Sequence, residues 1–432
     1  MAPEATVRCA SDGDVAETIA FIRRHSLRSA TRSGGHCFAG RSATSGVLID
    51  VSPMRSITVA DGVVRIEAGA VLGEIYSALI PHGLTIPGGT CPSVGIAGLT
   101  LGGGLGIMGR TYGLTSDRLV AARIVLADGR VVDCDEQHDG DLFWALRGGG
   151  TGHFGVVSEL TFDPVPTSTT TNLQLAWPSS AAVAVATAWM RWSPAAPDAL
   201  SASLLVGAGP DPDEQPSVEV VGTFLGASPD ARDLVDGLVA LVGSEPSSAV
   251  IEELSYADTM RSWAARAGEA LDDPRAEPPA RSTHLVKSEF FAGPPPTRAT
   301  SALFDRLVDA RVEGQGRGVD FSPWDGAYNR VPADTTAFVH RDASFWIKHE
   351  ASVAQDASPD QVGAARSWVD GSWDAVHPWG TGGVFPNFAD PDLEDWGHAY
   401  HGSNFERLCE IKGRYDPEDV FRFRQSLPVA RP

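Results

Sequence analysis

The chain has 432 residues, a length at which single hydrophobic cores give way to two domains. It is 43% hydrophobic and 21% charged, which is typical of a soluble globular protein. The formal net charge of −21 and the isoelectric point near 4.8 argue against a surface for nucleic acid or anionic membrane, which would need a basic patch.

Neither the start of the chain nor its cysteines indicates export. No charged segment with an apolar core opens the chain, and no run of about 18 apolar residues follows. The five cysteines are odd in number and scattered, which indicates neither a disulfide framework nor a zinc site. We expect a cytoplasmic monomer or homodimer that binds small molecules, without a metal, a nucleic acid or a membrane as partner.

The first third of the chain alternates helices with short strands. Helical spacing of apolar residues predicts helices over 11–28 and 71–83, the second closed by a glycine. Residues 118–134 are typical of two strands joined at the turn Asp128-Gly129. Short β-branched runs bounded by turn residues predict further strands at 46–51, 56–59 and 62–69.

A linker-like stretch at 163–170 opens the middle of the chain. The alternating apolar segments and amphipathic helices beyond it favour an antiparallel sheet covered by helices, hence an α+β fold. Residues 273–282 are expected to form a loop without chemistry of its own. Near the end, Asp416 as N-cap and Pro417 as first helical residue predict a helix start. The alternating segments and helices of the middle part lie at 201–209, 216–226, 228–242 and 359–375.

Two glycine-rich stretches, 32–40 and 87–117, need a physical reason. The second contains a literal G-x-G-x-x-G, but glycines rather than a β-branched strand precede it, so we reject a Rossmann interpretation. Glycine is tolerated where a backbone turns sharply or approaches a ligand closely. Bare N–H groups in two such loops would suit an extended polyanion, and a pyrophosphate-containing cofactor fits that demand. Plain tight turns are the alternative.

Each glycine-rich stretch contains one candidate nucleophile, His36 in the first and Cys91 in the second. A neutral imidazole or a thiolate can attack an electron-poor ring. The alternatives are a hydrogen-bonded turn histidine and a buried thiol.

These stretches belong to a set of motifs that occur in the same order in one known family. The chain resembles the berberine bridge enzyme-like flavin oxidases of the vanillyl-alcohol oxidase/p-cresol methylhydroxylase (PCMH) superfamily. The resemblance implies an FAD-binding domain in two parts, a PCMH-type segment at 1–165 and a C-terminal segment at 386–432. An inserted substrate domain at 170–385 would form an antiparallel sheet over the isoalloxazine. The motifs are "RSGGHCFAG" (32–40), "GGTCPSVGIAGLTLGGGLG" (88–106), "YGLTSD" (112–117), "DLFWALRGGG" (141–150) and "YHGSNFERL" (400–408).

The resemblance implies FAD attached by two bonds, 8α-N-histidyl through His36 and 6-S-cysteinyl through Cys91. Val157 would lie at the adenine end, and Asn404 would contact the flavin. The implied pyrophosphate contacts are Arg32, Ser33, Gly34, Gly35 and Cys37. The residues implied along the rest of the cofactor are Gly88, Gly89, Thr90, Val94, Gly95, Gly98, Gly103, Gly106 and Gly113.

The implied reaction is hydride transfer from a substrate C–H to FAD, with O₂ as acceptor and H₂O₂ as product. It would convert an alcohol or hemiacetal to a ketone or lactone, or close a ring oxidatively. A base must take the accompanying proton. Tyr400 is the first candidate, and Lys348 and Glu350, which share one face of a predicted strand with Trp346, could set or assist that base. Tyr328 is a further candidate. The alternatives are a core tyrosine and a solvated strand face.

The sequence departs from the family where relatives carry hydroxyl groups. Phe38, Phe385 and Phe388 stand at positions where relatives often have tyrosine, and His401 replaces another. A site poor in hydroxyl groups favours a bulky aromatic or polyketide-like substrate over a carbohydrate. A carbohydrate oxidase, a dehydrogenase with one flavin bond, and a flavin-binding scaffold or carrier without turnover remain alternatives.

Overall fold

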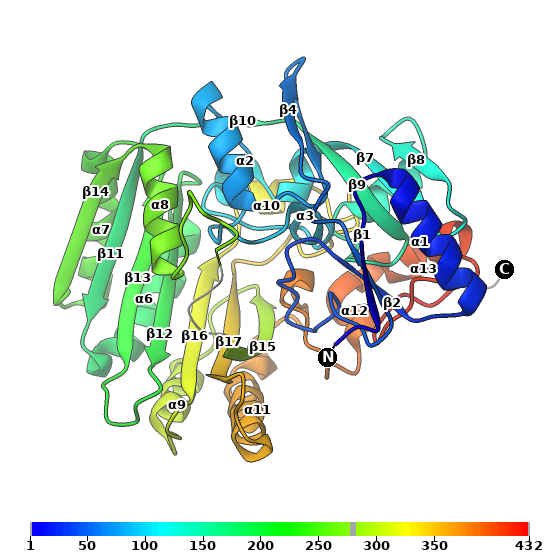
Figure 1. Cartoon of the computed structure of the whole chain (residues 1–432). Coiled ribbons are helices and arrows are strands. Elements are labelled where there is room, and N and C mark those ends of the chain that lie inside the picture. Colours follow the sequence, from blue (N-terminus) through cyan, green and yellow to red (C-terminus); the bar gives the residue numbers. More distant parts are fainter. Residues whose placement is uncertain (1, 277–281, 431–432) are drawn as a thin grey trace.

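The computed structural model describes residues 2–276 and 282–430 and confirms the α+β fold. Two lobes lie side by side, and both chain ends belong to the same lobe (Figure 1). That lobe holds a parallel three-stranded sheet in the order β1-β3-β2 and an antiparallel five-stranded sheet in the order β4-β5-β9-β7-β8. Its strands are β1 (Ala5–Arg8), β2 (Ser29–Arg32), β3 (Val47–Asp50), β4 (Ile57–Ala60), β5 (Val63–Glu67), β6 (Leu84–Thr85), β7 (Leu119–Leu126), β8 (Val131–Cys134), β9 (Gly155–Phe162) and β10 (Val165–Pro166).

The helices of this lobe come from both ends of the chain. Helix α1 starts where Ser11 accepts a hydrogen bond from the Asp14 N–H, and Ser26 ends it in the left-handed conformation. The predicted helix over 11–28 and the hairpin at 128–129 are therefore confirmed. The helices are α1 (Asp12–His25), α2 (Leu72–Leu79), α3 (Ile96–Leu101), α4 (Gly109–Tyr112), α5 (Gly140–Leu146), α12 (Trp396–His401) and α13 (Phe405–Tyr415).

The second lobe is a seven-stranded antiparallel sheet in the order β14-β11-β13-β12-β16-β17-β15. Helices α6, α7, α9 and α11 cover one face of it (Figure 1). The strands are β11 (Thr170–Trp177), β12 (Leu200–Ala208), β13 (Ser217–Phe224), β14 (Ser248–Leu254), β15 (Ser282–Phe291), β16 (Gly316–Pro323) and β17 (Phe345–Ala354). The helices are α6 (Ala182–Ala195), α7 (Ser228–Val242), α8 (Tyr256–Arg266), α9 (Thr297–Val308), α10 (Ala327–Arg330) and α11 (Pro359–Asp374).

Strand β17 shows how the sheet positions side chains. Phe345, Ile347 and Ala351 alternate into the core under the helices, so Lys348 and Glu350 point to the opposite face, as predicted. Helix α8 lies on that side, because its buried residues join the core of the first lobe. The sheet face that carries Lys348 and Glu350 therefore looks toward the first lobe.

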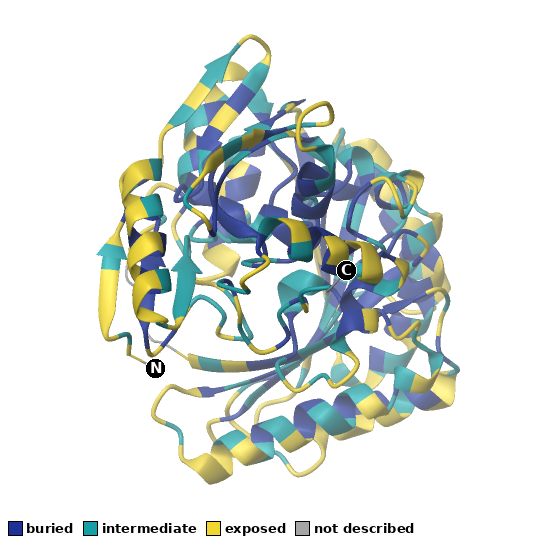
Figure 2. Cartoon of the chain, turned by 90° about the vertical axis from the view of Figure 1, so that its right-hand side faces the viewer, coloured by how far each residue is buried: buried dark blue, intermediate teal, exposed yellow. Residues whose placement is uncertain are grey.

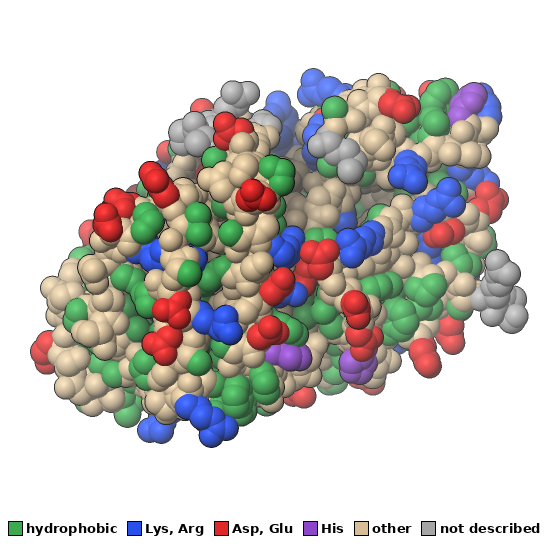
Figure 3. Space-filling view, turned by 90° about the horizontal axis from the view of Figure 1, so that it is seen from below, with side chains coloured by type: hydrophobic (Ala, Val, Ile, Leu, Met, Phe, Trp, Pro, Cys, Tyr) green, Lys and Arg blue, Asp and Glu red, His purple; other side chains and the backbone are tan. Residues whose placement is uncertain are grey.

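Each lobe has its own hydrophobic core, visible as blocks of buried residues in Figure 2. Leu408, Ile411 and Leu427 from the end of the chain complete the core of the first lobe. The exact domain boundaries at 165/170 and 385/386 stay predictions. The face seen in Figure 3 carries acidic and basic side chains interspersed. In the described part of the chain, no helix is long and apolar enough to cross a membrane.

Two local predictions need comment. Asp416 is not an N-cap: it ends α13, and its carboxylate accepts from Lys412 Nζ and from the Val420 and Phe421 N–H groups. The sequence pattern was misleading because this buried ion pair uses the same carboxylate that would cap a helix. Of the predicted loop at 273–282, residues 277–281 lie outside the described residues, and Ser282 already begins β15.

Candidate active site

The two glycine-rich stretches meet in the structure. A Cβ atom on Gly34 would lie 2.2 Å from the backbone nitrogen of Gly95, and a Cβ on Gly95 would lie 2.3 Å from that of Gly34. A Cβ on Gly106 would likewise lie 1.7 Å from the carbonyl oxygen of Gly88. No other residue fits such approaches without moving the backbone. The structure thus brings predicted cofactor residues from both stretches into one place.

These loops present a run of unpaired donors. The backbone N–H groups of Gly34, Gly35, His36 and Cys37 have no acceptor among residues 2–276 and 282–430. Within the same described ranges, those of Gly89, Thr90 and Cys91 also lack one. These residues are exposed or half-buried, so their N–H groups are open to a ligand or to water. Successive free N–H groups form an anion-binding concavity, so the residues present fit the pyrophosphate of a dinucleotide cofactor.

His36 and Cys91 lie in this region, and their pKa values are shifted in opposite directions. His36 Nε2 is 2.8 Å from Ser93 Oγ, and partial burial lowers the pKa of His36, against the opposing effect of Glu269. The pKa of Cys91 is about 11. Burial raises it most and Glu269 raises it as well, whereas Lys348 lowers it. At neutral pH the imidazole is therefore neutral and nucleophilic, whereas the thiol keeps its proton.

The face of the second sheet contributes a charged cluster. Lys348 Nζ lies 2.7 Å from Asp320 Oδ2 and 2.8 Å from Glu350 Oε2. Glu350 Oε1 also lies 2.5 Å from His284 Nδ1. The charges of this cluster act on Cys91 in the second glycine stretch: Lys348 lowers the pKa of its thiol, and Glu350 raises it.

The pKa values in the cluster follow from this pairing. Burial alone would raise the pKa of Glu350, but Lys348 and His284 bring it to about 2. Burial would lower the pKa of Lys348, but Asp320 and Glu350 outweigh it and raise that pKa. The hydrogen bond that His284 donates to the Glu350 carboxylate raises the pKa of His284. With both basic groups protonated, two positive and two negative charges balance.

Aromatic side chains join the first glycine stretch to this sheet face. The rings of Phe38 and Phe388 stack with centroids 5.4 Å apart, and Phe388 lies 5.0 Å from Trp346. Lys348 Nζ lies 5.7 Å from the centroid of Phe388. The indole N–H of Trp346 is buried and has no partner among the described residues. Aromatic rings thus line the region between the first glycine stretch and the sheet face of the second lobe, and Lys348 lies at its edge.

Tyr400 lies close to the first glycine stretch but its hydroxyl is already bonded. The hydroxyl donates to the Asp390 carbonyl at 3.1 Å and accepts from the Asp390 N–H at 2.8 Å. Burial raises its pKa to about 12, although Arg41 lowers it. This geometry favours the alternative of a structural tyrosine, and its role as base stays a prediction. Tyr328 is also buried, and its hydroxyl donates to the Gly106 carbonyl at 3.3 Å.

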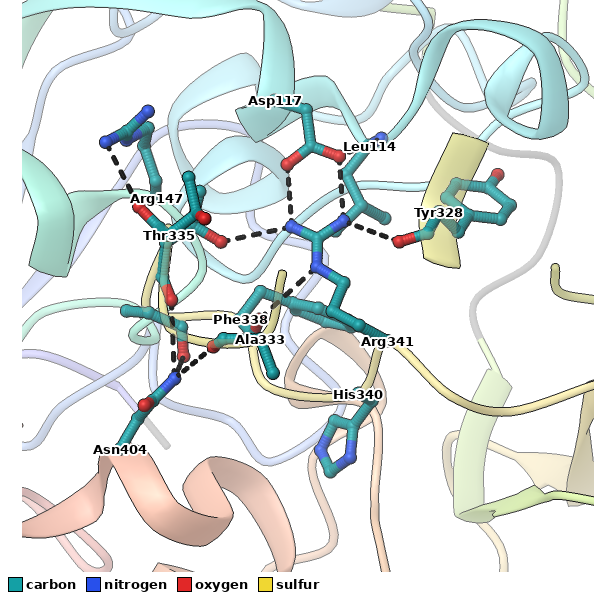
Figure 4. A network of polar contacts seen from close by, with 12 residues as sticks. Leu114, Asp117, Arg147, Tyr328, Ala333, Thr335, Phe338, His340, Arg341 and Asn404 are labelled. Carbon is teal, nitrogen blue, oxygen red and sulfur yellow. Dashed lines mark hydrogen bonds and ion pairs between the residues drawn. The ribbon is translucent and has the colours of Figure 1, made fainter. Parts of the chain in front are cut away.

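The amide of Asn404 holds a neighbouring loop. Its Nδ2 donates to the carbonyls of Ala333, Thr336 and Ala337 at 2.8, 3.3 and 3.4 Å (Figure 4). The predicted contact of Asn404 with the flavin stays untested.

The end of the second glycine stretch is fixed by a buried ion pair that sequence reasoning missed. Arg341 forms two hydrogen bonds with Asp117, at 2.7 and 2.8 Å, and also donates to the Tyr328 carbonyl (Figure 4). Asp117 in turn accepts from the Leu114 N–H, which shapes the turn after Gly113. A charge-assisted pair of this kind gives the loop a defined geometry.

Other predicted cofactor residues show contacts with protein. Arg32 lies 3.6 Å from Asp50, and Ser33 Oγ donates to the Ala68 carbonyl. Val157 is buried in the first core. A Cβ on Gly103 would lie 2.9 Å from the ring of Phe338, whereas one on Gly98 would meet nothing within 4 Å. Their roles toward a cofactor stay predictions.

Comparison with known proteins agrees with this geometry. The family model "FAD binding domain" matches residues 3–135, and "Berberine and berberine like" matches residues 384–428. The uncharacterized FAD-linked oxidoreductase YgaK of Bacillus subtilis is 32% identical, over 99% of this chain and 92% of the relative. Tetrahydroberberine oxidase of Berberis wilsoniae is 27% identical, over 99% of this chain and 85% of the relative.

A solved structure shares the fold over the whole length of this chain. Glucooligosaccharide oxidase of Acremonium strictum, described as revealing a novel flavinylation, has a TM-score of 0.88 and 26% identity, over 100% of this chain and 92% of the other. The chain belongs to the berberine bridge enzyme-like family of FAD-linked oxidoreductases in the PCMH superfamily.

Proposed function

We propose that this oxidoreductase is an oxidase that carries FAD on two covalent bonds, through His36 and Cys91. The observation that carries the proposal is the junction of two glycine loops, each with one nucleophile and with N–H donors that have no acceptor in the part of the chain that the structure describes. The loop donors would hold the pyrophosphate, and the two nucleophiles would hold the isoalloxazine. FAD supplies the acceptance of hydride and its passage to O₂, giving H₂O₂.

The charged cluster is proposed to manage the proton of the reaction. Glu350 is ionised at neutral pH and lies at the aromatic-walled region, so its carboxylate can accept a hydrogen bond from a substrate hydroxyl. Its low pKa makes it a weak base toward a resting alcohol, but the hydroxyl becomes strongly acidic as hydride leaves the neighbouring carbon, and the proton can then pass to Glu350. Lys348 holds that carboxylate in place and balances its charge. Tyr400 keeps its proton at neutral pH and donates it to the Asp390 carbonyl, whereas Glu350 is already ionised, so we assign the first role to Glu350.

The substrate class follows from the walls of the region. Phe38, Phe388 and Trp346 offer ring faces and few hydroxyl groups, which suits a bulky aromatic or polyketide-like alcohol. A ring-closing oxidation would use the same groups. The similarity to a glucooligosaccharide oxidase makes carbohydrate oxidation the second candidate.

The test is an O₂-consumption screen with purified protein. A panel of polycyclic aromatic alcohols and a matched panel of oligosaccharides would be offered in air, with H₂O₂ as second readout. The proposal expects H₂O₂ release with the aromatic panel. Turnover only with sugars would overturn the substrate assignment, and substrate-reduced flavin that ignores O₂ would make the protein a dehydrogenase.

A further inference from the structure

Glu269 and Ser93 occupy a position for which the proposed reaction gives no role. Glu269 follows α8 in the second lobe, yet its Oε2 accepts a hydrogen bond from the Ser93 N–H at 2.9 Å in the first lobe. The Ser93 hydroxyl in turn lies 2.8 Å from His36 Nε2. A chain of contacts thus runs from the second lobe to the proposed point of flavin attachment.

The contact between Ser93 and His36 bears on which imidazole nitrogen carries the proton. A neutral imidazole has one protonated nitrogen and one with a free lone pair, and the hydrogen bond at one decides the state of the other. When Nε2–H donates to the serine hydroxyl oxygen, Nδ1 keeps the lone pair needed for attack on carbon, and we take this tautomer as the reactive one. Glu269 keeps Ser93 in place because its carboxylate accepts a hydrogen bond from the Ser93 backbone N–H.

The charge of Glu269 acts on both nucleophiles. It is the charged group that raises the pKa of His36, and it is also the first charged contributor that raises the pKa of Cys91. An imidazole that forms a bond to carbon becomes cationic until it loses its proton, so a nearby carboxylate favours that step. The same carboxylate disfavours the thiolate that Cys91 must form.

We propose that Ser93 and Glu269 are positioning residues for flavin attachment, which promote the bond at His36 Nδ1 and oppose the bond at Cys91. This inference rests on the proposed covalent FAD. In the His36 step, an N–C bond forms at C8α and one C8α–H bond breaks. Two electrons and two protons, one from C8α and one from the imidazole, then reside on the flavin. O₂ takes both electrons and both protons and leaves as H₂O₂. The Cys91 step balances in the same way: a C–S bond forms at C6, the C6–H and S–H bonds break, and two electrons and two protons pass by way of the flavin to O₂.

The test follows each bond separately by intact mass. Protein made under riboflavin limitation, so that an apo fraction remains, would be incubated with FAD in air, and the covalent fraction followed with time. The Cys91→Ala background reports the His36 bond alone, and the His36→Ala background reports the Cys91 bond alone. Ser93→Ala and Glu269→Gln would be placed in each background. Matched controls are the exposed Ser45→Ala and Glu245→Gln.

The expected results differ between the two backgrounds. Ser93→Ala and Glu269→Gln should slow the His36 bond at least about tenfold, as loss of an orienting partner commonly does. Glu269→Gln should leave the Cys91 bond as fast or faster. Unchanged His36 kinetics, or equal slowing of both bonds, would overturn this inference alone. A wild type that never binds FAD would overturn the proposed function with it.

Discussion

The two lobes contribute to the site in different ways. The first lobe supplies backbone: its two glycine loops present N–H groups of Gly34, Gly35 and their neighbours, with few side chains involved. The second lobe supplies side chains: Lys348, Glu350 and His284 project from one face of a sheet. The first arrangement can hold a cofactor common to a whole family, and the second can be altered residue by residue to suit a substrate.

This difference explains what sequence reasoning could reach. The glycine loops, helix α1 and the hairpin at 128–129 depend on local signals, so they were predictable. The face shared by Lys348 and Glu350 followed from strand alternation. The partners of this pair did not follow, because His284 approaches Glu350 only through the register that pairs Val286 with Glu350.

Long-range contacts account for the remaining gaps. Asp320 meets Lys348 because β16 and β17 pair at that position. Glu269 reaches Ser93 across 176 positions of sequence, and Arg341 reaches Asp117 across 224. No motif marks such contacts, since the first exists only once the sheet has formed and the other two only once the lobes are packed together.

The largest effect is expected at the acid–base group of the second lobe. Glu350→Gln should keep bound flavin but slow its anaerobic reduction by the best alcohol substrate by about 10²–10⁴-fold, because the proton acceptor is lost. Tyr400→Phe is the matched comparison and should slow reduction far less, since its hydroxyl already bonds Asp390. The reverse order of the two variants would assign the base to Tyr400.

Removing the central cation tests the charged cluster itself. Lys348→Met should lower the free energy of unfolding by about 3 kcal/mol, because Asp320 loses the cation it pairs with and Glu350 keeps only His284. Adding Asp320→Asn should recover part of that loss. Urea unfolding would measure both variants, and a Lys348→Met variant as stable as wild type would show that solvent screens the cluster.

A methyl group added at Gly34 tests the close approach of the two glycine stretches in the first lobe. Gly34→Ala should lower stability by about 1–3 kcal/mol and abolish flavin binding, because its Cβ would overlap Gly95. Gly237→Ala, in helix α7 with open space around it, is the control and should be neutral or slightly stabilising. A yellow, fully stable Gly34→Ala variant would contradict the account of this loop.

Two buried histidines, one in each lobe, make the stability of the protein depend on pH. Burial lowers the pKa of His349, in the second lobe, and of His401, in the C-terminal segment, each to about 3. Because these folded pKa values lie below the unfolded value near 6.5, stability is complete above that pH and falls as the pH drops below it, by about 1.4 kcal/mol per pH unit for each histidine.

Variants of each histidine show which of the two lobes is destabilised by low pH. His401→Phe and His349→Gln should each flatten the decline in unfolding free energy between pH 6 and about 4, measured in urea. The exposed His82→Gln should leave it unchanged. A decline that neither buried variant alters would mean that carboxylates control acid unfolding.

The most direct test of the central claim is the intact mass of the denatured protein, for wild type, His36→Ala, Cys91→Ala and the double variant. The account predicts one flavin on the wild type, one on each single variant, and an unmodified mass for the double variant. A wild type of unmodified mass that releases yellow FAD would contradict covalent attachment, and a colourless one that fails to bind added FAD would contradict the flavin site itself.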